Sequence, residues 1–208
     1  ALAVGAVRGA RGNSGVVLSQ VMRGFAQAAN NGATEGEMLA VALTNAVGFV
    51  DRAIAKPVEG TIITVLRAAA DATRPNAHLP LHDVAAAATA AAQDALRLTQ
   101  TQLPALREAG VVDAGGAGLV AVLNTLTDLG AAEREGEGEP EDVDRQTPQT
   151  HGTQGELEVM FSFRGDLDAL KGELAGLGDS LIIAPLNDAE ATVHIHSRDA
   201  GTVSYTHL

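Results

Sequence analysis

The 208-residue sequence predicts a mainly α-helical protein: an antiparallel helical barrel or bundle, followed by an acidic linker and a partial small α/β domain. Three observations support this fold class. Alanine-rich segments carry apolar residues at helical spacing as far as residue 130. Residues 131–154 contain almost nothing apolar, and after residue 155 the apolar period changes to two. We therefore expect a helical domain over 1–130, a flexible linker over 131–154 and an α/β piece over 155–202.

Each expected helix has its own start or stop signal. The first covers residues 14–29, and Thr34 with Glu37 forms a capping-box pattern for a second, to about residue 50. Pro57 interrupts the chain, and two prolines make 73–80 a loop. The remaining helices are expected over residues 61–71, 83–98, 104–109 and 116–129. Gly110 has the place of a glycine that ends a helix.

The second part predicts a β-α-β-β order. Apolar residues alternate over 157–163 and 191–197, a helix is expected over 166–175, and 180–186 has the composition of a buried strand. A further helix is expected to begin near Asp199. Residues 203–208 show no periodicity, and we expect them to lie outside the fold as a non-native tail. Because this piece has only about 50 residues, it is marginal as an independent fold. We expect His194 and His196, which lie beyond the linker, to contribute little to the stability of the helical domain or to nucleotide binding.

Composition narrows the classes of function. The net charge is −12, and most of the acidic excess follows residue 130, which argues against nucleic acid or anionic membranes as partners. There is no cysteine, no apolar run of membrane-spanning length and no signal peptide, so a cytoplasmic location is predicted. Arg8, Arg11 and Arg23 lie near the first glycine-rich turn, where they serve either a phosphate or ordinary surface solvation.

Three glycine-rich turns stand out against the alanine-rich helices. A glycine in helical sequence costs about 1 kcal/mol relative to alanine, so three such turns suggest that backbone must approach something closely. Backbone N–H groups at a helix N-terminus bind anions, and phosphate is the usual one. The turns are Gly9-Ala10-Arg11-Gly12-Asn13-Ser14-Gly15, Pro57-Val58-Glu59-Gly60-Thr61 and Val112-Asp113-Ala114-Gly115-Gly116-Ala117-Gly118.

Each turn also has a simpler interpretation. Ser14 either caps a helix or bonds a phosphate oxygen. Thr61 either caps the helix that follows or presents its N–H to a ligand. Asp113 either caps the last helix or contacts a ribose or a metal.

Together the three turns match one family in order and spacing. The chain resembles the DhaL-like kinase domain, the nucleotide-binding domain of dihydroxyacetone kinases, and within that group it is most similar to the bacterial fatty acid kinase A subunit. The likeness covers residues 1–130. Residues 155–201 resemble the middle domain of that protein, chiefly through Val193-His194-Ile195-His196 and Asp199-Ala200-Gly201.

The resemblance implies a barrel of antiparallel helices with ATP at one end. It assigns the nucleotide to three groups of residues: Asn13, Ser14 and Gly15; Gly60 and Thr61; and Asp113, Gly115 and Gly116. It also implies transfer of the γ-phosphate of ATP to a fatty acid carboxylate presented by a DegV-like carrier protein, giving an acyl phosphate. The oligomeric state stays open, a homodimer included.

One departure concerns magnesium. The family holds Mg²⁺ with aspartates of a D-G-D-T-G-T-N motif upstream of the first turn, and no such motif occurs in this sequence. Because phosphoryl transfer depends on a metal bridging the β- and γ-phosphates, we expect this chain to be a fragment that does not transfer phosphate alone.

His194 and His196 share one face of a predicted strand. Two imidazoles on one face can bind zinc together with further ligands. The family adds a cysteine from the domain's first strand, where this chain has Glu156 and Glu158 as replacements. The simpler interpretation is a pair of half-exposed strand histidines.

Three functions therefore remain under consideration. The first is the ATP-binding part of a fatty acid kinase. The second is a phosphotransfer subunit of the dihydroxyacetone kinase type, which the linker and second domain argue against. The third is a non-catalytic helical binding or scaffold module, which leaves the matched turns without a purpose.

Overall fold

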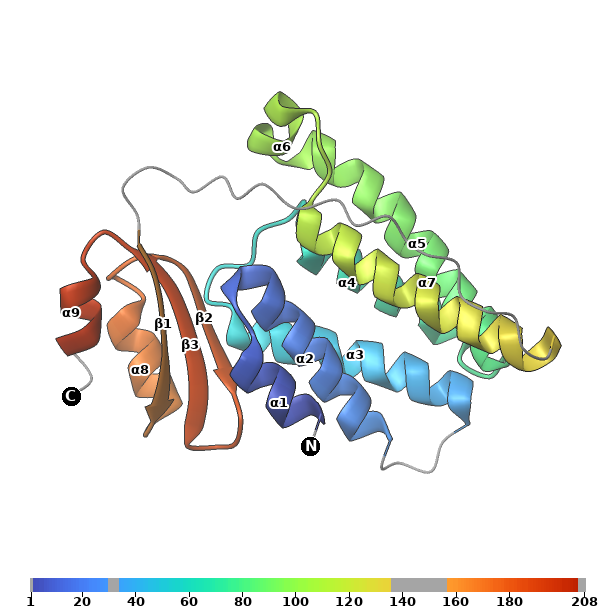
Figure 1. Cartoon of the computed structure of the whole chain (residues 1–208), viewed down its shortest axis with the longest axis horizontal. Coiled ribbons are helices and arrows are strands. Elements are labelled where there is room, and N and C mark those ends of the chain that lie inside the picture. Colours follow the sequence, from blue (N-terminus) through green and yellow to red (C-terminus); the bar gives the residue numbers. More distant parts are fainter. Residues whose placement is uncertain (1, 30–33, 136–156, 206–208) are drawn as a thin grey trace.

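The computed structural model describes residues 2–29, 34–135 and 157–205. The helical part consists of α1 (Leu2–Gly9), α2 (Gly12–Ala28), α3 (Glu35–Ala53), α4 (Ile62–Thr73), the 3₁₀ turn η1 (Arg74–Asn76), α5 (Leu81–Gln102), α6 (Pro104–Ala109) and α7 (Ala114–Glu135). Figure 1 shows α2 beside α3, and α4, α5 and α7 packed together above them. The predicted helical bundle is confirmed.

Local sequence signals set several helix ends where they were expected. The Glu37 N–H donates to Thr34 Oγ1 (3.3 Å) and the Thr34 N–H donates to Glu37 Oε2 (3.0 Å), so the capping box at the start of α3 is formed. Gly110 ends α6 in the left-handed conformation, with φ of 70°. The caps are therefore encoded locally.

The bundle core consists of small aliphatic side chains. Leu39 and Leu43 of α3, Leu66 of α4, and Leu119 and Leu123 of α7 are almost completely buried. Buried alanines separate them, so the helices approach closely. At the crossing of α2 and α3, a Cβ added to Gly24 would lie 2.2 Å from the carbonyl oxygen of Ala42. Close helix contact therefore depends on small residues.

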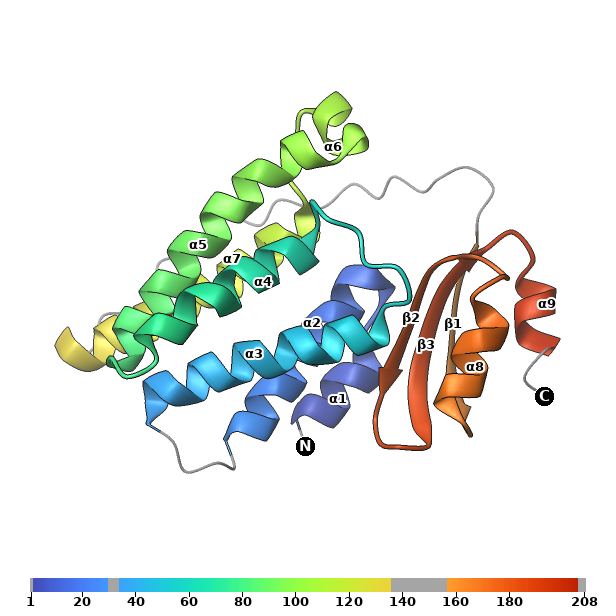
Figure 2. The same ribbon diagram turned by 180° about the vertical axis from the view of Figure 1, so that it is seen from behind.

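A three-stranded antiparallel sheet follows, in the order β1 (Leu157–Arg164), β3 (Glu190–Ser197), β2 (Asp179–Pro185). Helix α8 (Leu167–Leu174) lies between β1 and β2 in sequence, and α9 (Ala200–Tyr205) follows β3. The predicted β-α-β-β order is confirmed. Both helices cover one face of the sheet, and the other face is turned toward α1, α2 and α3 (Figure 2).

The sheet shares its core with the helical part. Ile182 and Ala184 of β2 belong to the same hydrophobic cluster as the helices, while Leu181 and Ile183 belong to a second cluster beneath α8 and α9. Ile54 forms an antiparallel bridge with Ile182. Alternate residues of β2 therefore fill two cores, and the sheet packs directly against the helical bundle.

Three features also differ from the sequence prediction. Helix α7 runs to Glu135, past its expected end near residue 130, and α1 was not expected at all. Val203 is fully buried in the second cluster within α9, so the expectation that residues 203–208 lie outside the fold is wrong at this residue. Residues 136–154 of the expected linker, and 206–208, lie outside the described residues.

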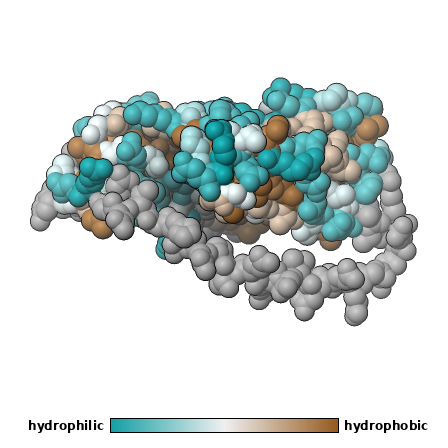
Figure 3. All heavy atoms as spheres, turned by 90° about the horizontal axis from the view of Figure 1, so that it is seen from above, coloured by the Kyte–Doolittle hydropathy of each residue, from teal (hydrophilic) through white to brown (hydrophobic). Residues whose placement is uncertain are grey.

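One face of the molecule is mainly hydrophilic, as the charged composition of the chain predicts. On the face seen from above, hydrophilic residues predominate and apolar residues form separate smaller patches (Figure 3). No helix in the described ranges is both long and apolar enough to cross a bilayer.

Candidate functional site

One pocket brings the three glycine-rich turns together. It has a volume of about 310 Å³ and lies where α2, α4 and α7 begin. Of the predicted nucleotide residues, it is lined by Asn13, Ser14, Thr61 and Asp113. Gly15, Gly60, Gly115 and Gly116 belong to the same turns without lining the cavity. Because each helix has its positive dipole end at its N-terminus, three such ends at one cavity favour an anion there.

Two of these three helix starts are satisfied from within the chain. At α4, the Ile63 N–H donates to Thr61 Oγ1 (3.3 Å), and the Thr61 hydroxyl donates to the carbonyl of Val58 (2.8 Å). At α7, the Gly116 N–H donates to Asp113 Oδ2 (2.6 Å). The capping interpretation therefore holds for both Thr61 and Asp113.

The start of α2 is different. The helix begins at Gly12, and Arg11 before it makes no side-chain capping bond. Ser14 is the third helical residue rather than the cap, so the interpretation of Ser14 as a cap is wrong. The first N–H groups of any helix lack intrahelical acceptors, and here no capping side chain takes their place. The α2 N-terminus is thus the one of the three that is open to a ligand.

Asn13 adds a second unsatisfied polar group at this start. Its Oδ1 atom is buried and has no hydrogen-bond partner. Ser14 is exposed beside it. A buried polar atom without a partner costs about 1–3 kcal/mol, so this arrangement gains most from a ligand that pairs with it.

Asp113 is the carboxylate of the pocket. Its side chain accepts from the N–H groups of Gly116 and Ile62, and thus ties the start of α7 to the start of α4. Burial nonetheless raises the pKa of Asp113 above its ordinary value, because desolvation outweighs the two hydrogen bonds.

Close backbone approach explains the glycines of the third turn. A Cβ added to Gly115 would lie 2.4 Å from Ser14 Oγ, and one added to Gly116 would lie 2.9 Å from Val65 Cγ2. Gly60 has φ of 81°, which side chains rarely adopt. The glycines therefore allow the three helix starts to meet.

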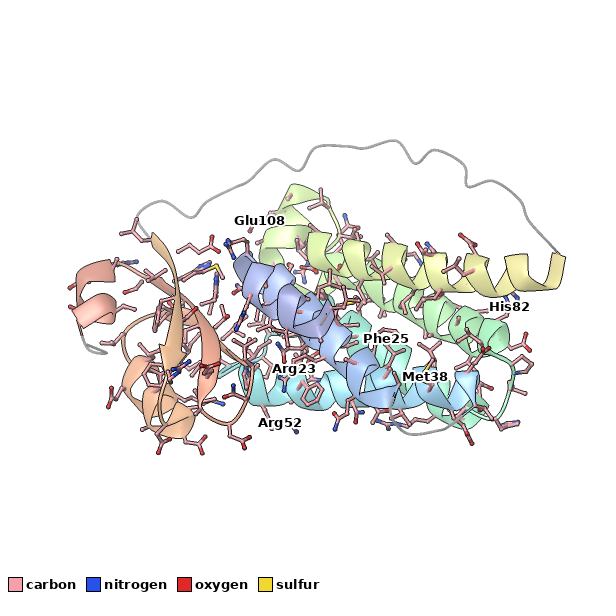
Figure 4. The ribbon with its side chains drawn as sticks, turned by 60° about the horizontal axis from the view of Figure 1, so that its bottom comes forward. Arg23, Phe25, Met38, Arg52, His82 and Glu108 are labelled. Carbon is pink, nitrogen blue, oxygen red and sulfur yellow. The ribbon has the colours of Figure 1, made fainter. Side chains whose placement is uncertain are left out.

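The predicted basic residues do not gather at the pocket. Arg11 donates to the carbonyls of Ala10 (2.8 Å) and Arg8 (3.3 Å). Arg23 lies over the Phe49 ring, 4.3 Å from its centroid, with Arg52 on the same ring at 5.2 Å. Figure 4 shows Arg23 and Arg52 at the end of the bundle nearer the sheet, and His82 at the opposite end. Arg23 and Phe49 line a separate pocket of about 350 Å³.

Sequence reasoning missed Lys56, Ser180 and Ile182, which also line the pocket at the α2 start. Lys56 stands directly before the Pro57–Thr61 turn, and this was the available signal. Ser180 and Ile182 come from β2, about 120 residues further along the chain than the Pro57–Thr61 turn. No local pattern connects them to the turn.

The histidine pair lies on the sheet face that is turned toward the helices. His194 is fully buried, and neither of its ring nitrogens has a hydrogen-bond partner. Its Nδ1 lies 3.3 Å from Glu158 Oε1, and its ring centroid lies 5.0 Å from that of His196. The interpretation of His194 as half-exposed is therefore wrong.

The surroundings of His194 suit a neutral imidazole. Burial lowers its pKa below the ordinary value, and this outweighs the opposite effect of Glu158. Across the described ranges, no group of three or more histidine, cysteine or acidic side chains is arranged to hold a metal. Glu156, the other predicted oxygen ligand, lies outside the described residues.

Comparisons with known proteins agree with this geometry. Residues 1–128 match the model of the DAK2 domain family, and residues 155–207 match the family of middle domains like that of the fatty acid kinase A subunit. The chain therefore belongs to the DAK2-domain kinase family, and its helical domain is followed by a middle domain of the fatty acid kinase type.

Individual relatives align with most of this chain. Protein YloV of Bacillus subtilis is 35% identical over 98% of the chain and 40% of its own length. Uncharacterized proteins of Staphylococcus haemolyticus and Staphylococcus saprophyticus are 34% and 32% identical, each over 96% of the chain and 40% of its own length. The chain thus spans about two fifths of the length of these curated relatives.

Proposed function

We propose that this chain is the ATP-binding part of a kinase that phosphorylates a fatty acid carboxylate, giving an acyl phosphate. The observation that carries the proposal is the uncapped N-terminus of α2, which opens into the pocket where α4 and α7 also begin. In this proposal the triphosphate lies against the N–H groups of Asn13, Ser14 and Gly15. Gly60, Thr61, Gly115 and Gly116 hold the turns that surround it.

Mg²⁺ is part of the proposal. When bound, it would supply positive charge that neutralises the charge developing on the phosphates during transfer. Asp113 fits a site that includes a cation, because its carboxylate shares the pocket with the proposed phosphate and would otherwise repel it. The chain's own residues would then bind and orient the nucleotide.

The fatty acid and its carrier belong to the same proposal. The middle-domain match supports a fatty acid kinase over a kinase of the dihydroxyacetone type. We propose a DegV-like carrier protein as the partner that presents the acyl carboxylate. The two family matches also argue against a purely structural helical module.

ATP binding to the 208-residue chain tests the nucleotide assignment. Isothermal titration calorimetry with Mg²⁺ should show one site. Ser14→Ala should weaken binding about two- to tenfold through loss of one hydrogen bond. Ser14→Asp should weaken it about tenfold or more, since it sets a carboxylate against the phosphates.

The matched control is Thr125→Glu, which adds the same charge to the exposed face of α7. It should leave the affinity unchanged. An acid in the first turn of a helix is favourable to the helix, but Asp113 lines the same pocket, so the thermal denaturation of Ser14→Asp is measured to show that the variant remains folded. Equal ATP affinity for wild type and Ser14→Asp would refute the assignment.

Zinc at the histidine pair is a separate proposal. His194 could be a metal ligand because neither buried ring nitrogen has a hydrogen-bond partner, and neutral imidazole is the form that coordinates. His196 would be the second ligand and Glu158 or Glu156 a third. The described side chains do not form a ready three-ligand site, so we expect low zinc occupancy. Zinc content by mass spectrometry should be lower in a His194→Ala, His196→Ala double variant than in wild type. Equal content would remove both residues from the site.

A further inference from the structure

We propose that Lys56 binds the polyphosphate end of the pocket's ligand, and that strand β2 of the second domain positions it there. The identity of the ligand as a nucleotide rests on the proposed function. The anionic character of the subsite rests on the residues themselves. The pocket is thus a shared site of both domains.

Lys56 supplies the positive charge of this pocket. Among the described residues that line it, Lys56 is the one cation and Asp113 the one carboxylate. Lys56 makes no salt bridge or hydrogen bond with any residue in the described ranges. Arg67 on neighbouring α4, in contrast, is held by both Asp51 and Glu59. A lysine at a pocket mouth without a protein partner is available to an anion.

The backbone next to Lys56 is attached to β2. The Ala55 N–H donates to the carbonyl of Leu181 (3.1 Å), and Ile54 is bridged to Ile182. One helical turn earlier, Lys171 Nζ of α8 donates to the carbonyl of Arg52 (3.2 Å). The segment that leads to Lys56 therefore runs along the edge of the sheet. The sheet fixes the backbone position from which the Lys56 side chain extends.

Ser180 marks the place where β2 meets the pocket. It has φ of 55°, and among the described residues it is the one non-glycine residue with positive φ. The pairing of β2 with β3 is irregular between Asp179 and Ile182, which includes this residue. Such a conformation persists only where the surroundings hold it. The irregular backbone at the beginning of β2 therefore lies at the edge of the cavity, where Ser180 lines it.

The same pocket is also lined by Asn13, with its unpaired Oδ1, and by the open α2 N-terminus. A ligand in this pocket would contact α2 as well as Lys56 and Ser180. Since Ile182 lines the same cavity and belongs to the bundle core, occupation of the pocket should also strengthen the docking of the sheet.

The first test separates phosphate binding from nucleoside binding. Affinities of wild type, Lys56→Gln and Lys56→Arg are measured calorimetrically for ATP, AMP and inorganic tripolyphosphate. Lys56→Gln should weaken ATP and tripolyphosphate at least tenfold and change AMP by less than twofold, while Lys56→Arg should keep most of the affinity. Arg97→Gln removes an equal charge from an exposed pair with Asp94 and should change nothing.

The second test is a double-mutant cycle with Ser180→Gly. Glycine can adopt the same positive φ at position 180, but it leaves the backbone there more flexible. Ser180→Gly should weaken tripolyphosphate binding in wild type and have no further effect in Lys56→Gln. Equal effects in both backgrounds would show that β2 does not act through Lys56. Unchanged tripolyphosphate affinity in Lys56→Gln would overturn the assignment of the lysine.

The outcomes also separate this inference from the proposed function. Loss of ATP affinity in Ser14→Asp together with normal affinity in Lys56→Gln would keep the nucleotide site and overturn the role of Lys56. Lys56-dependent binding of tripolyphosphate with no preference for ATP would keep the role of Lys56 and contradict the nucleotide assignment. A wild-type chain that binds neither ligand would overturn both.

Discussion

Asp113 links the folding stability of the protein to the protonation state of the pocket. Its carboxylate accepts from the starts of two helices, α4 and α7, and burial raises its pKa. The folded chain therefore keeps a proton on Asp113 to higher pH than the unfolded chain does. Between the ordinary pKa of about 3.9 and the raised one, the folded state binds more protons, so its stability falls as the pH rises.

Asp113→Asn should remove this contribution. The free energy of unfolding of the variant, minus that of wild type, should increase as the pH rises above about 4. Urea denaturation at a series of pH values from about 4 to about 7 measures it. Thr125→Ala, an uncharged change on the exposed face of the same helix, should give a constant difference. A constant difference for Asp113→Asn would mean that burial does not perturb this carboxyl.

At the residue scale, the sequence predicted the part of the site that local motifs encode. Asn13, Ser14, Thr61 and Asp113, predicted as nucleotide ligands, all line one pocket, because each stands in a glycine-rich turn at a helix start; their role as ligands stays a prediction. Lys56 lies outside those turns, and Ser180 lies in the other domain. Their place at the pocket depends on the pairing of Ala55 with Leu181, which no single-sequence pattern specifies.

The effect of a glycine on helix packing in this protein depends on whether another helix lies against it. Gly24 lies at the crossing of α2 and α3, where an added Cβ would approach the Ala42 carbonyl to 2.2 Å. Gly118 lies inside α7, where an added Cβ would meet no atom within 4 Å. The same substitution should therefore have opposite effects at the two positions.

Gly24→Ala should destabilise the protein by about 1–3 kcal/mol, since forced overpacking outweighs the gain in helix propensity. Gly118→Ala should stabilise it by about 0.5–1 kcal/mol, because only the propensity changes. Chemical denaturation followed by circular dichroism measures both. Stabilisation by Gly24→Ala would show that α2 and α3 are not in close contact at this crossing.

At the element scale, the sequence predicted helix termini that carry a capping signal better than termini without one. The capping box of Thr34 and Glu37 and the terminal Gly110 lie where the structure has them, because capping is local. Helix α5 continues to Gln102, because nothing directly after Leu98 breaks it. Helix α7 continues through Gly130, the expected stop, to Glu135, because a single glycine in a helix costs only about 1 kcal/mol. Helix α9 was expected to begin near Asp199, but its packing through Val203 depends on the sheet.

At the scale of the whole molecule, β2 joins what the sequence presents as two units. Ile182 is 3% exposed, lines the pocket at the start of α2 and belongs to the core of the helical bundle. The linker-like composition of residues 131–154 suggested that the helical bundle and the sheet fold independently. A long separation along the chain, however, does not prevent the two parts from packing together. The two parts therefore should unfold together.

Ile182→Ala should lower the stability of the helical bundle by about 2–5 kcal/mol, the usual cost of this truncation in a core. The far-ultraviolet circular dichroism of the helices follows the bundle during urea denaturation. Leu157→Ala, on an exposed residue of β1, should change the midpoint little. An unchanged midpoint for Ile182→Ala would mean that the bundle is stable without the sheet.

The central claim is that a nucleotide binds where α2, α4 and α7 begin, against the wall formed by Lys56 and Ser180. A crystal structure of the 208-residue chain with Mg²⁺ and a non-hydrolysable ATP analogue tests it most directly. We predict that the phosphates lie within hydrogen-bond distance of the backbone N–H groups at Asn13 and Ser14, with the Lys56 ammonium beside them. Phosphates bound instead at Arg23 and Arg52, with the pocket at the α2 start empty, would contradict the claim.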